Sequence, residues 1–154
     1  MARAGLFIDA SLLVLLVVGS VGRDRISKHR RLRGAYTAED YDILVDLISP
    51  VDRVFVTPNT LTEASNLLGH HAEPERSRLF DKLRAFIQKS EEIVVASEDA
   101  SGNIAFQRLG LTDAALLELV TTESPLLTAD LDLYLEALAK GNEAAVNFTH
   151  HRNL

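Results

Sequence analysis

Cysteine and tryptophan are absent from this sequence of 154 residues, and methionine occurs once. Without cysteine the chain has no disulfide framework, no thiolate nucleophile and no zinc or iron–sulfur site with cysteine ligands. Four prolines and eight glycines leave no proline-rich or glycine-rich linker. A chain of this length without a linker predicts one domain, which we place at residues 1–149, followed by a short C-terminal tail at 150–154.

Positive charge is also scarce, because 16 Lys and Arg stand against 22 Asp and Glu, for a net charge of −6. This balance argues against a protein that coats duplex nucleic acid through its overall charge. Residues 23–34 are the exception: they hold six basic residues and one acid, which leaves ten basic and 21 acidic residues elsewhere. The six are Arg23, Arg25, Lys28, Arg30, Arg31 and Arg33.

Long hydrophobic runs are missing as well, although residues 5–22 resemble one at first sight. The uncharged part, 10–22, has 13 residues, whereas a transmembrane helix needs about 20. Asp9 also interrupts the apolar stretch, where an ionised group is costly. We interpret the stretch as a buried strand, Leu6–Asp9, that leads directly into a buried helix, Ser11–Val18. We therefore expect a cytoplasmic protein without a membrane partner.

Short apolar runs alternate with helical patterns along the chain. Runs of this length, mostly β-branched, predict strands at Leu6–Ile8, Val54–Val56, Ile93–Ala96, Leu126–Leu127 and Ala145–Phe148. Helices are predicted after Thr37, with a capping box to Asp40, from Thr57 through Leu68, after Glu73-Pro74, from Thr112 to about Val120, and from Asp130 to Lys140. Ser97–Asn103 is expected to be a polar loop. The alternation predicts an α/β fold whose mainly parallel sheet is flanked by helices.

Several acidic residues follow or adjoin the predicted strands. They are Asp9 after the first strand, Glu63 on the helix after the second, Asp113 after the third, and Asp130 after the fourth, with Asp132 close behind. Since the carboxyl ends of parallel strands share one edge of a sheet, we expect the first four to converge. Taken singly, Asp113 and Asp130 are explained as helix-capping or dipole residues. Asp9 is harder to explain, because it lies between apolar runs and a buried charge needs a partner or a metal.

Clustered carboxylates without cysteine or nearby histidine suit Mg²⁺ or Mn²⁺. Such ions activate water and neutralise the charge of a phosphodiester during hydrolysis. Asn59 precedes Glu63 by four residues, and Asn66 and His70 continue the same polar helix face. Other chemistries fit less well, because the chain has no P-loop, no G-x-G-x-x-G and no G-x-S-x-G motif.

Four segments resemble the PIN domain, a family of metal-dependent ribonucleases, and cover nearly the whole chain in the family's order. They are Leu6–Leu16, Val56–Leu68, Leu109–Leu119 and Leu126–Leu138. The resemblance implies a sheet of about five parallel strands, Mg²⁺ or Mn²⁺ dependence, and hydrolysis of RNA to a 5′-phosphate and a 3′-hydroxyl. It assigns the catalytic and metal-binding roles to Asp9, Glu63, Asp113 and Asp130, with Asp132 as a secondary metal ligand and Thr128 as a supporting residue. Asn59 is a second supporting candidate because it shares the polar helix face of Glu63.

Many bacterial PIN proteins of this size are VapC-like toxins of type II toxin–antitoxin pairs. For such a toxin the resemblance implies an RNA substrate, a small antitoxin protein and a homodimer. The long basic stretch before Thr37 departs from a minimal toxin, so a stand-alone RNA-processing nuclease is a second interpretation. A third is a non-catalytic PIN-fold module that binds RNA or a protein through residues 23–34.

The basic segment itself has three interpretations: a solvated loop, an arm that draws RNA toward an acidic body through its phosphates, or a docking site for an acidic partner. The histidine pairs His70-His71 and His150-His151 do not indicate zinc, because adjacent side chains on a helix point apart. Surface or helix-end positions are expected for them.

Overall fold

Five short parallel strands form the centre of the structure, a computed structural model that describes residues 5–152. The strands are β1 (Leu6–Ile8), β2 (Val54–Val56), β3 (Glu91–Glu92), β4 (Leu126–Thr128) and β5 (Ala145–Asn147). Their order across the sheet is β3-β2-β1-β4-β5, and every pairing is parallel. The predicted α/β class with a five-stranded sheet is confirmed. The first strand of the chain is therefore the central one.

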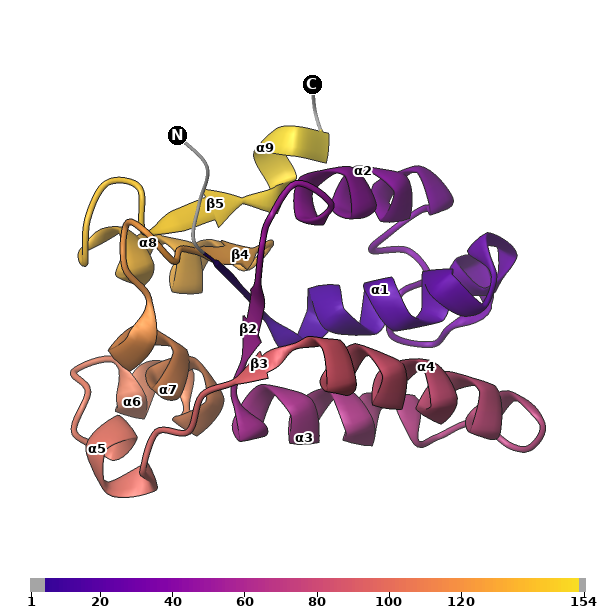
Figure 1. The fold of residues 1–154 in the computed structure, drawn as a ribbon, viewed down its shortest axis with the longest axis horizontal. Helices are drawn as coiled ribbons and strands as arrows, with labels where there is room; N and C mark the ends of the chain where they lie inside the picture. The colour runs from indigo at the N-terminus through magenta and orange to yellow at the C-terminus, as the bar shows by residue number, and fades with distance from the viewer. Residues whose placement is uncertain (1–4, 153–154) are drawn as a thin grey trace.

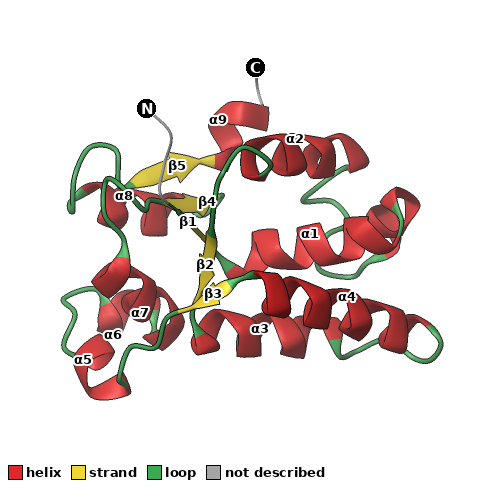
Figure 2. Cartoon of the chain, viewed as in Figure 1, coloured by secondary structure: helices red, strands yellow, loops and turns green. Residues whose placement is uncertain are grey.

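Helices cover the sheet on both faces (Figures 1 and 2). They are α1 (Ala10–Val21), the 3₁₀ helix η1 (Arg23–Lys28), α2 (Ala38–Ile48), α3 (Pro58–Leu68), α4 (Glu75–Lys89), α5 (Ser97–Ser101), α6 (Phe106–Leu109), α7 (Leu111–Leu119), α8 (Leu131–Leu138) and α9 (Phe148–Arg152). Successive side chains of β1 point to opposite faces of the sheet, so they contribute to two different parts of the core. Leu6 and Ile8 pack with α1, α3 and α4, whereas Phe7 packs with residues of α7 and α8.

The helix ends of α2 and α3 follow the sequence signals. Thr37 accepts a hydrogen bond from the backbone N–H of Asp40 (3.3 Å), and the Asp40 carboxylate accepts one from the N–H of Thr37 (2.8 Å). This reciprocal pair is the predicted capping box. Thr57 caps α3, with Pro58 in its first turn. Because these signals are local, they fix the helix starts without help from the rest of the fold.

Two expectations on the third strand are wrong. β3 is Glu91–Glu92, not Ile93–Ala96, and residues 97–101 form the helix α5 inside the expected polar loop. Val94 is 73% exposed. Ile93 and Val95 pack instead against hydrophobic clusters that include residues of α7. Only Ile93 still bonds to the sheet, through its backbone N–H to the carbonyl of Val56 (2.8 Å), so the apolar pattern after β3 mainly reflects packing against helices.

The C-terminal end also differs from expectation. The last strand stops at Asn147, and Phe148 begins α9, with its ring buried 6.2 Å from that of Tyr36. Residues 150–152, expected in a frayed tail, belong to this helix, while 153 and 154 lie outside the described residues. Arg152 donates to both carboxylate oxygens of the buried Asp40 (3.0 and 2.9 Å). α9 is therefore part of the packed domain.

The apolar stretch at the start of the chain is β1 and α1, as expected. α1 has 12 residues, and most of them are buried. Across residues 5–152, no helix combines the length and the apolar character that a membrane crossing requires.

Candidate functional site

Asp9 lies where β1 gives way to α1, and it is buried. One carboxylate oxygen, Oδ1, accepts from the backbone N–H of Leu12 (3.1 Å) and the hydroxyl of Ser11 (3.2 Å). The other, Oδ2, accepts from the hydroxyl of Thr128. Asp9 is thus the N-cap of α1, a role that stabilises a helix end. Burial raises the pKa of the Asp9 carboxyl despite these hydrogen bonds.

Thr128 joins the first acid to the fourth. β1 and β4 are neighbours in the sheet, with Ile8 opposite Leu127. The Thr128 hydroxyl donates to Asp9 and accepts from the backbone N–H of Asp130 (3.0 Å). Asp130 in turn caps α8, since its Oδ1 accepts from the N–H of Leu133 (3.1 Å). The Thr128 hydroxyl thus connects the Asp9 carboxylate to the backbone of Asp130, which is consistent with the supporting role that the resemblance implied.

Asp113 enters the same region from the first turn of α7. Gly110 precedes this helix with φ of 91° and ψ of 176°, a conformation that L-residues with a side chain rarely adopt. Thr112 was expected to cap this helix, but the helix begins at Leu111, two residues earlier than a Thr112 cap implies, and Thr112 lies within it. The glycine sets the direction of α7 and so the position of Asp113.

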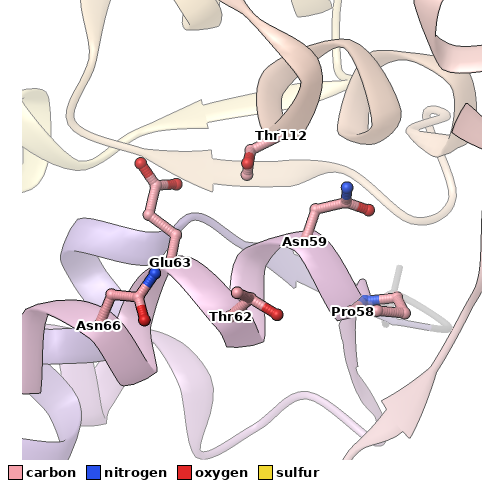
Figure 3. A pocket seen from close by; sticks show the side chains of 6 residues that line it. All are labelled: Pro58, Asn59, Thr62, Glu63, Asn66 and Thr112. Atoms are coloured by element: carbon pink, nitrogen blue, oxygen red, sulfur yellow. The ribbon is translucent and has the colours of Figure 1, made fainter. Parts of the chain in front are cut away.

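Glu63 is contributed by α3, where it lines an open cavity of about 370 Å³. Asn59, Asn66 and Thr112 line the same cavity. Figure 3 shows Asn59 and Glu63 pointing from α3 toward Thr112 at the start of α7. The polar face of α3 predicted from the sequence thus faces the helix that carries Asp113.

The pKa of Asp113 shows that the four acids form one electrostatic group. Partial burial raises it first, and the charges of Asp130, Asp9 and Glu63 add to the effect, bringing it to about 7. These three carboxylates come from three other elements, so the fold brings together residues up to 121 positions apart in the chain. The four acids thus influence one another electrostatically, and their convergence on one cation site stays a prediction.

The four carboxylates suit a hard divalent cation as ligands, because such ions prefer oxygen. A bound cation would also reduce the repulsion among the four negative charges. A carboxylate offers about four lone-pair directions. Asp9 uses three of them and Asp130 uses one in the hydrogen bonds described above. Within residues 5–152, however, no three His, Asp or Glu side chains already form a group that could hold a metal ion. The acids would have to move closer together to share one.

Asp132, the secondary candidate, lies apart from this group. Its side chain is 71% exposed on α8, and its carboxylate lies 4.0 Å from Arg108. It is not among the charges that raise the pKa of Asp113. Its position matches that of a surface ion-pair residue.

Two site neighbours were not recognised from the sequence. Ser11 bonds to Asp9, and its hydroxyl lies 3.4 Å from the Tyr36 hydroxyl. Burial raises the pKa of Tyr36, with Asp9 among the charges that add to the effect. Ser11 could have been found from its place two residues after Asp9. Tyr36 gave no such signal, since only the turn after η1 brings it back to the start of α1.

The basic segment, residues 23–34, is folded onto the domain, because its own side chains Ile26 and Leu32 are buried. Its first half is paired: Arg23 with Asp42 (2.8 Å), Arg25 with Glu75 (2.6 Å) and Lys28 with Asp24 (3.6 Å). Arg30, Arg31 and Arg33 are exposed, and no ion pair within the described part of the chain includes them. Three of the six cations remain available to an anionic ligand.

No protein-family model matches this chain, and no curated protein sequence matches it either. The fold agrees with the one that the resemblance to PIN domains implied, namely helices around a five-stranded parallel sheet. Membership of that family and its activity are therefore put forward below as proposals.

We expect the metal-free protein to become less stable as the pH rises from about 5 to 8. Asp113 has a pKa of about 7 in the folded state and 3.8 as its ordinary value. Between these values the folded state binds more protons, so stability falls as pH rises. Because the group is partly solvated, we expect a loss of about 1–2 kcal/mol. Urea unfolding in the presence of a chelator, at several pH values, measures it.

The matched variant for this measurement is Asp113→Asn, which cannot titrate. His29 acts in the opposite direction, because burial lowers its pKa from 6.5 to about 4 and stability is lost as pH falls through this range. Both proteins contain His29, so the difference between them isolates Asp113. Parallel pH profiles for the two proteins would contradict the expectation.

Proposed function

We propose that this protein is a Mg²⁺- or Mn²⁺-dependent endoribonuclease of the PIN type. The observation that carries the proposal is the link through Thr128, whose hydroxyl donates to Asp9 and accepts from the backbone N–H of Asp130. The pKa of Asp113 agrees with it, because it is raised by burial and by the charges of Asp130, Asp9 and Glu63. A group of acids at the carboxyl edge of a parallel sheet destabilises the folded state, because the like charges repel one another. It is useful where cations must be held against an anionic substrate.

The four acids differ in how firmly they are held. Asp9 and Asp130 are fixed by helix caps and by Thr128, so they provide a rigid half of the site. Glu63 is exposed on α3 and Asp113 is partly exposed on α7, so they form the half that can adjust. Together they would hold Mg²⁺ or Mn²⁺, which when bound supplies positive charge for the phosphodiester and lowers the pKa of the attacking water. Asn59 and Thr112 offer hydrogen bonds to a substrate in the adjoining cavity.

RNA is the substrate class that the resemblance implies, and we place the enzyme in the cytoplasm, where RNA is available. The toxin role, a small antitoxin and a homodimer follow from the same resemblance. Co-purification with the product of an adjacent small reading frame is the test for the toxin role. A protein that is purified alone and leaves growth unaffected when expressed would instead indicate a stand-alone nuclease.

The test of the activity is cleavage of a mixed pool of RNA in the presence of Mn²⁺, with and without a chelator. We expect cleavage with Mn²⁺ and none with the chelator. Glu63→Gln should reduce the rate at least about 100-fold, because a charge that holds the cation is lost. Glu143→Gln, at an exposed glutamate outside the acidic group, is the matched control and should not change the rate.

Two results would contradict the proposal. Cleavage that persists in the chelator would exclude cation-dependent chemistry at this site. RNA binding without any cleavage, under all cations tried, would favour the non-catalytic module that binds through residues 23–34.

A further inference from the structure

A second polar cavity lies at the end of α3 that is remote from the sheet. It has a volume of about 590 Å³ and lies between the end of η1, with the residues that follow it, and the end of α3, with the turn that follows it. Lys28, Arg30 and Arg31 line it from the first side, and His70 and His71 line it from the other. α1 and α3 both lead away from the sheet, so the segments after them meet at the same end of the molecule (Figure 1). The lining contains no acid.

His29 lies at the inner wall of this cavity and is 2% exposed. Its Nδ1 accepts a hydrogen bond from the backbone N–H of Arg31 (3.1 Å). In a neutral ring the proton therefore lies on Nε2. Within residues 5–152, Nε2 is buried and has no hydrogen-bond partner. A buried donor without an acceptor is costly, and such groups in native proteins call for an explanation.

The surroundings of His29 indicate what that acceptor is. Burial lowers the pKa of His29 to about 4, with further lowering by His71, Arg31 and His70, so the ring is neutral near pH 7. The ring of His71 lies 4.9 Å away. Arg30 and Arg31 have no acidic partner in the part of the chain described here. The Nε2–H of His29 lacks an acceptor, and the charges of Arg30 and Arg31 lack a neutralising acid. An anion with several acceptor oxygens would satisfy both.

We propose that this cavity is a phosphate-binding pocket, in which the side chains of Arg30 and Arg31 hold the oxygens of one phosphate group and the Nε2–H of His29 donates to it once the side chains that cover Nε2 shift. The group has two chemical sources, the backbone of a nucleic-acid strand and a free phosphate. The pocket itself does not depend on the proposed function. Its use by a nucleic-acid strand does rest on the ribonuclease proposal.

The geometry of α3 favours the strand as the source. Asn59, Glu63 and Asn66 line the cavity beside the acids, and His70 lines the basic one. The five-residue step from Glu63 to Leu68, the last residue of α3, spans about 8 Å at a rise of about 1.5 Å per residue, and His70 lies two residues further along the chain. At about 3.4 Å per nucleotide of a stacked strand, the helical part alone corresponds to about two nucleotides. One strand bound at the pocket would then pass the acidic group.

The experiment titrates inorganic phosphate, and separately a 5′-phosphorylated DNA hexamer, into the metal-free protein in a chelator. The imidazole NMR signals of His29 report occupancy of the pocket. We expect both probes to shift these signals, and Arg31→Ser to weaken the binding of each about tenfold. Arg33→Ser removes the same charge from the same segment, but Arg33 lines a different cavity, so it should have little effect.

The donor is tested by a pair of changes at His29. Asn can keep an acceptor for the Arg31 N–H but has no donor at the Nε2 position, whereas Gln can place its amide N–H there. His29→Asn should therefore lose phosphate binding, and His29→Gln should retain part of it. Because His29 is buried and these variants risk misfolding, the surface comparison of Arg31→Ser with Arg33→Ser decides the matter.

If Arg31→Ser and Arg33→Ser weaken the affinity for the probes equally, the proposed pocket is wrong. The result would show that the basic segment attracts anions only through its overall charge. Absence of any shift with inorganic phosphate and hexamer would also overturn it. If phosphate binds and Arg31→Ser leaves hexamer affinity unchanged, the pocket stands and its ligand is a free phosphate. Glu63→Gln should bind inorganic phosphate as the wild type does, because Glu63 does not line this cavity, so a failure of the ribonuclease proposal is separable from a failure of the pocket.

Discussion

Asp9→Asn is expected to reduce cleavage at least about 100-fold while leaving the melting temperature unchanged or slightly higher. Asn caps helices about as well as Asp does, so its side-chain oxygen can still accept from the N–H of Leu12. The change removes a buried charge whose pKa is raised by burial and by Asp130. Activity is measured on RNA with saturating Mn²⁺, and stability by thermal unfolding in a chelator.

The control for this prediction is Asp9→Ala, which removes both the charge and the cap. It should lose activity equally and also lose about 0.5–2 kcal/mol of stability. A melting temperature of metal-free Asp9→Asn as low as that of Asp9→Ala would contradict our account. It would mean that the ionised carboxylate bound to Thr128 and Ser11 is a structural requirement.

Addition of Mg²⁺ or Mn²⁺ is expected to raise the melting temperature of the wild-type protein by about 5–10 °C at about 100 times the dissociation constant. A cation that binds the folded state stabilises it by mass action, and here it also relieves repulsion among four carboxylates. The double variant Asp9→Asn, Asp113→Asn should lose most of this shift. Thermal unfolding over a series of cation concentrations measures it.

The matched control replaces two exposed aspartates outside the acidic group, Asp46→Asn and Asp99→Asn. It removes the same net charge, so it should keep the full shift. If the cation raises the melting temperatures of both double variants to the same extent, the ion binds elsewhere and the four-acid site is wrong.

Local signals in the sequence were enough for most of the fold. The Thr37–Asp40 box and the Thr57-Pro58 pair each involve neighbouring residues, and their helices begin where predicted. The stretch at 93–96 was misassigned because periodicity reports burial and not the partner that buries it. Ile93 and Val95 are covered by helical clusters that only the tertiary structure reveals.

The candidate site divides in the same way. The four acids could be found because strand ends in a parallel sheet share an edge, a rule of topology. The role of Asp9 as a helix cap was missed, since the burial of its neighbours drew attention to its charge and not to its position at a helix start. His29 was missed because its Nε2 is notable only for the absence of an acceptor among the described residues, which a sequence does not show.

The order of strands in the sheet has a consequence for synthesis on the ribosome. β1 is made first and lies in the centre, and each later strand pairs with one that is already present: β2 with β1, β3 with β2, β4 with β1 and β5 with β4. The nascent chain can therefore extend the sheet without waiting for a later partner. The four acids are not synthesised together: Asp9 and Glu63 come early in the chain, whereas Asp113 and Asp130 follow α6. A nascent chain that still lacks β4 also lacks Asp130, which follows it, so it holds only part of the acidic group that the proposed cation site requires.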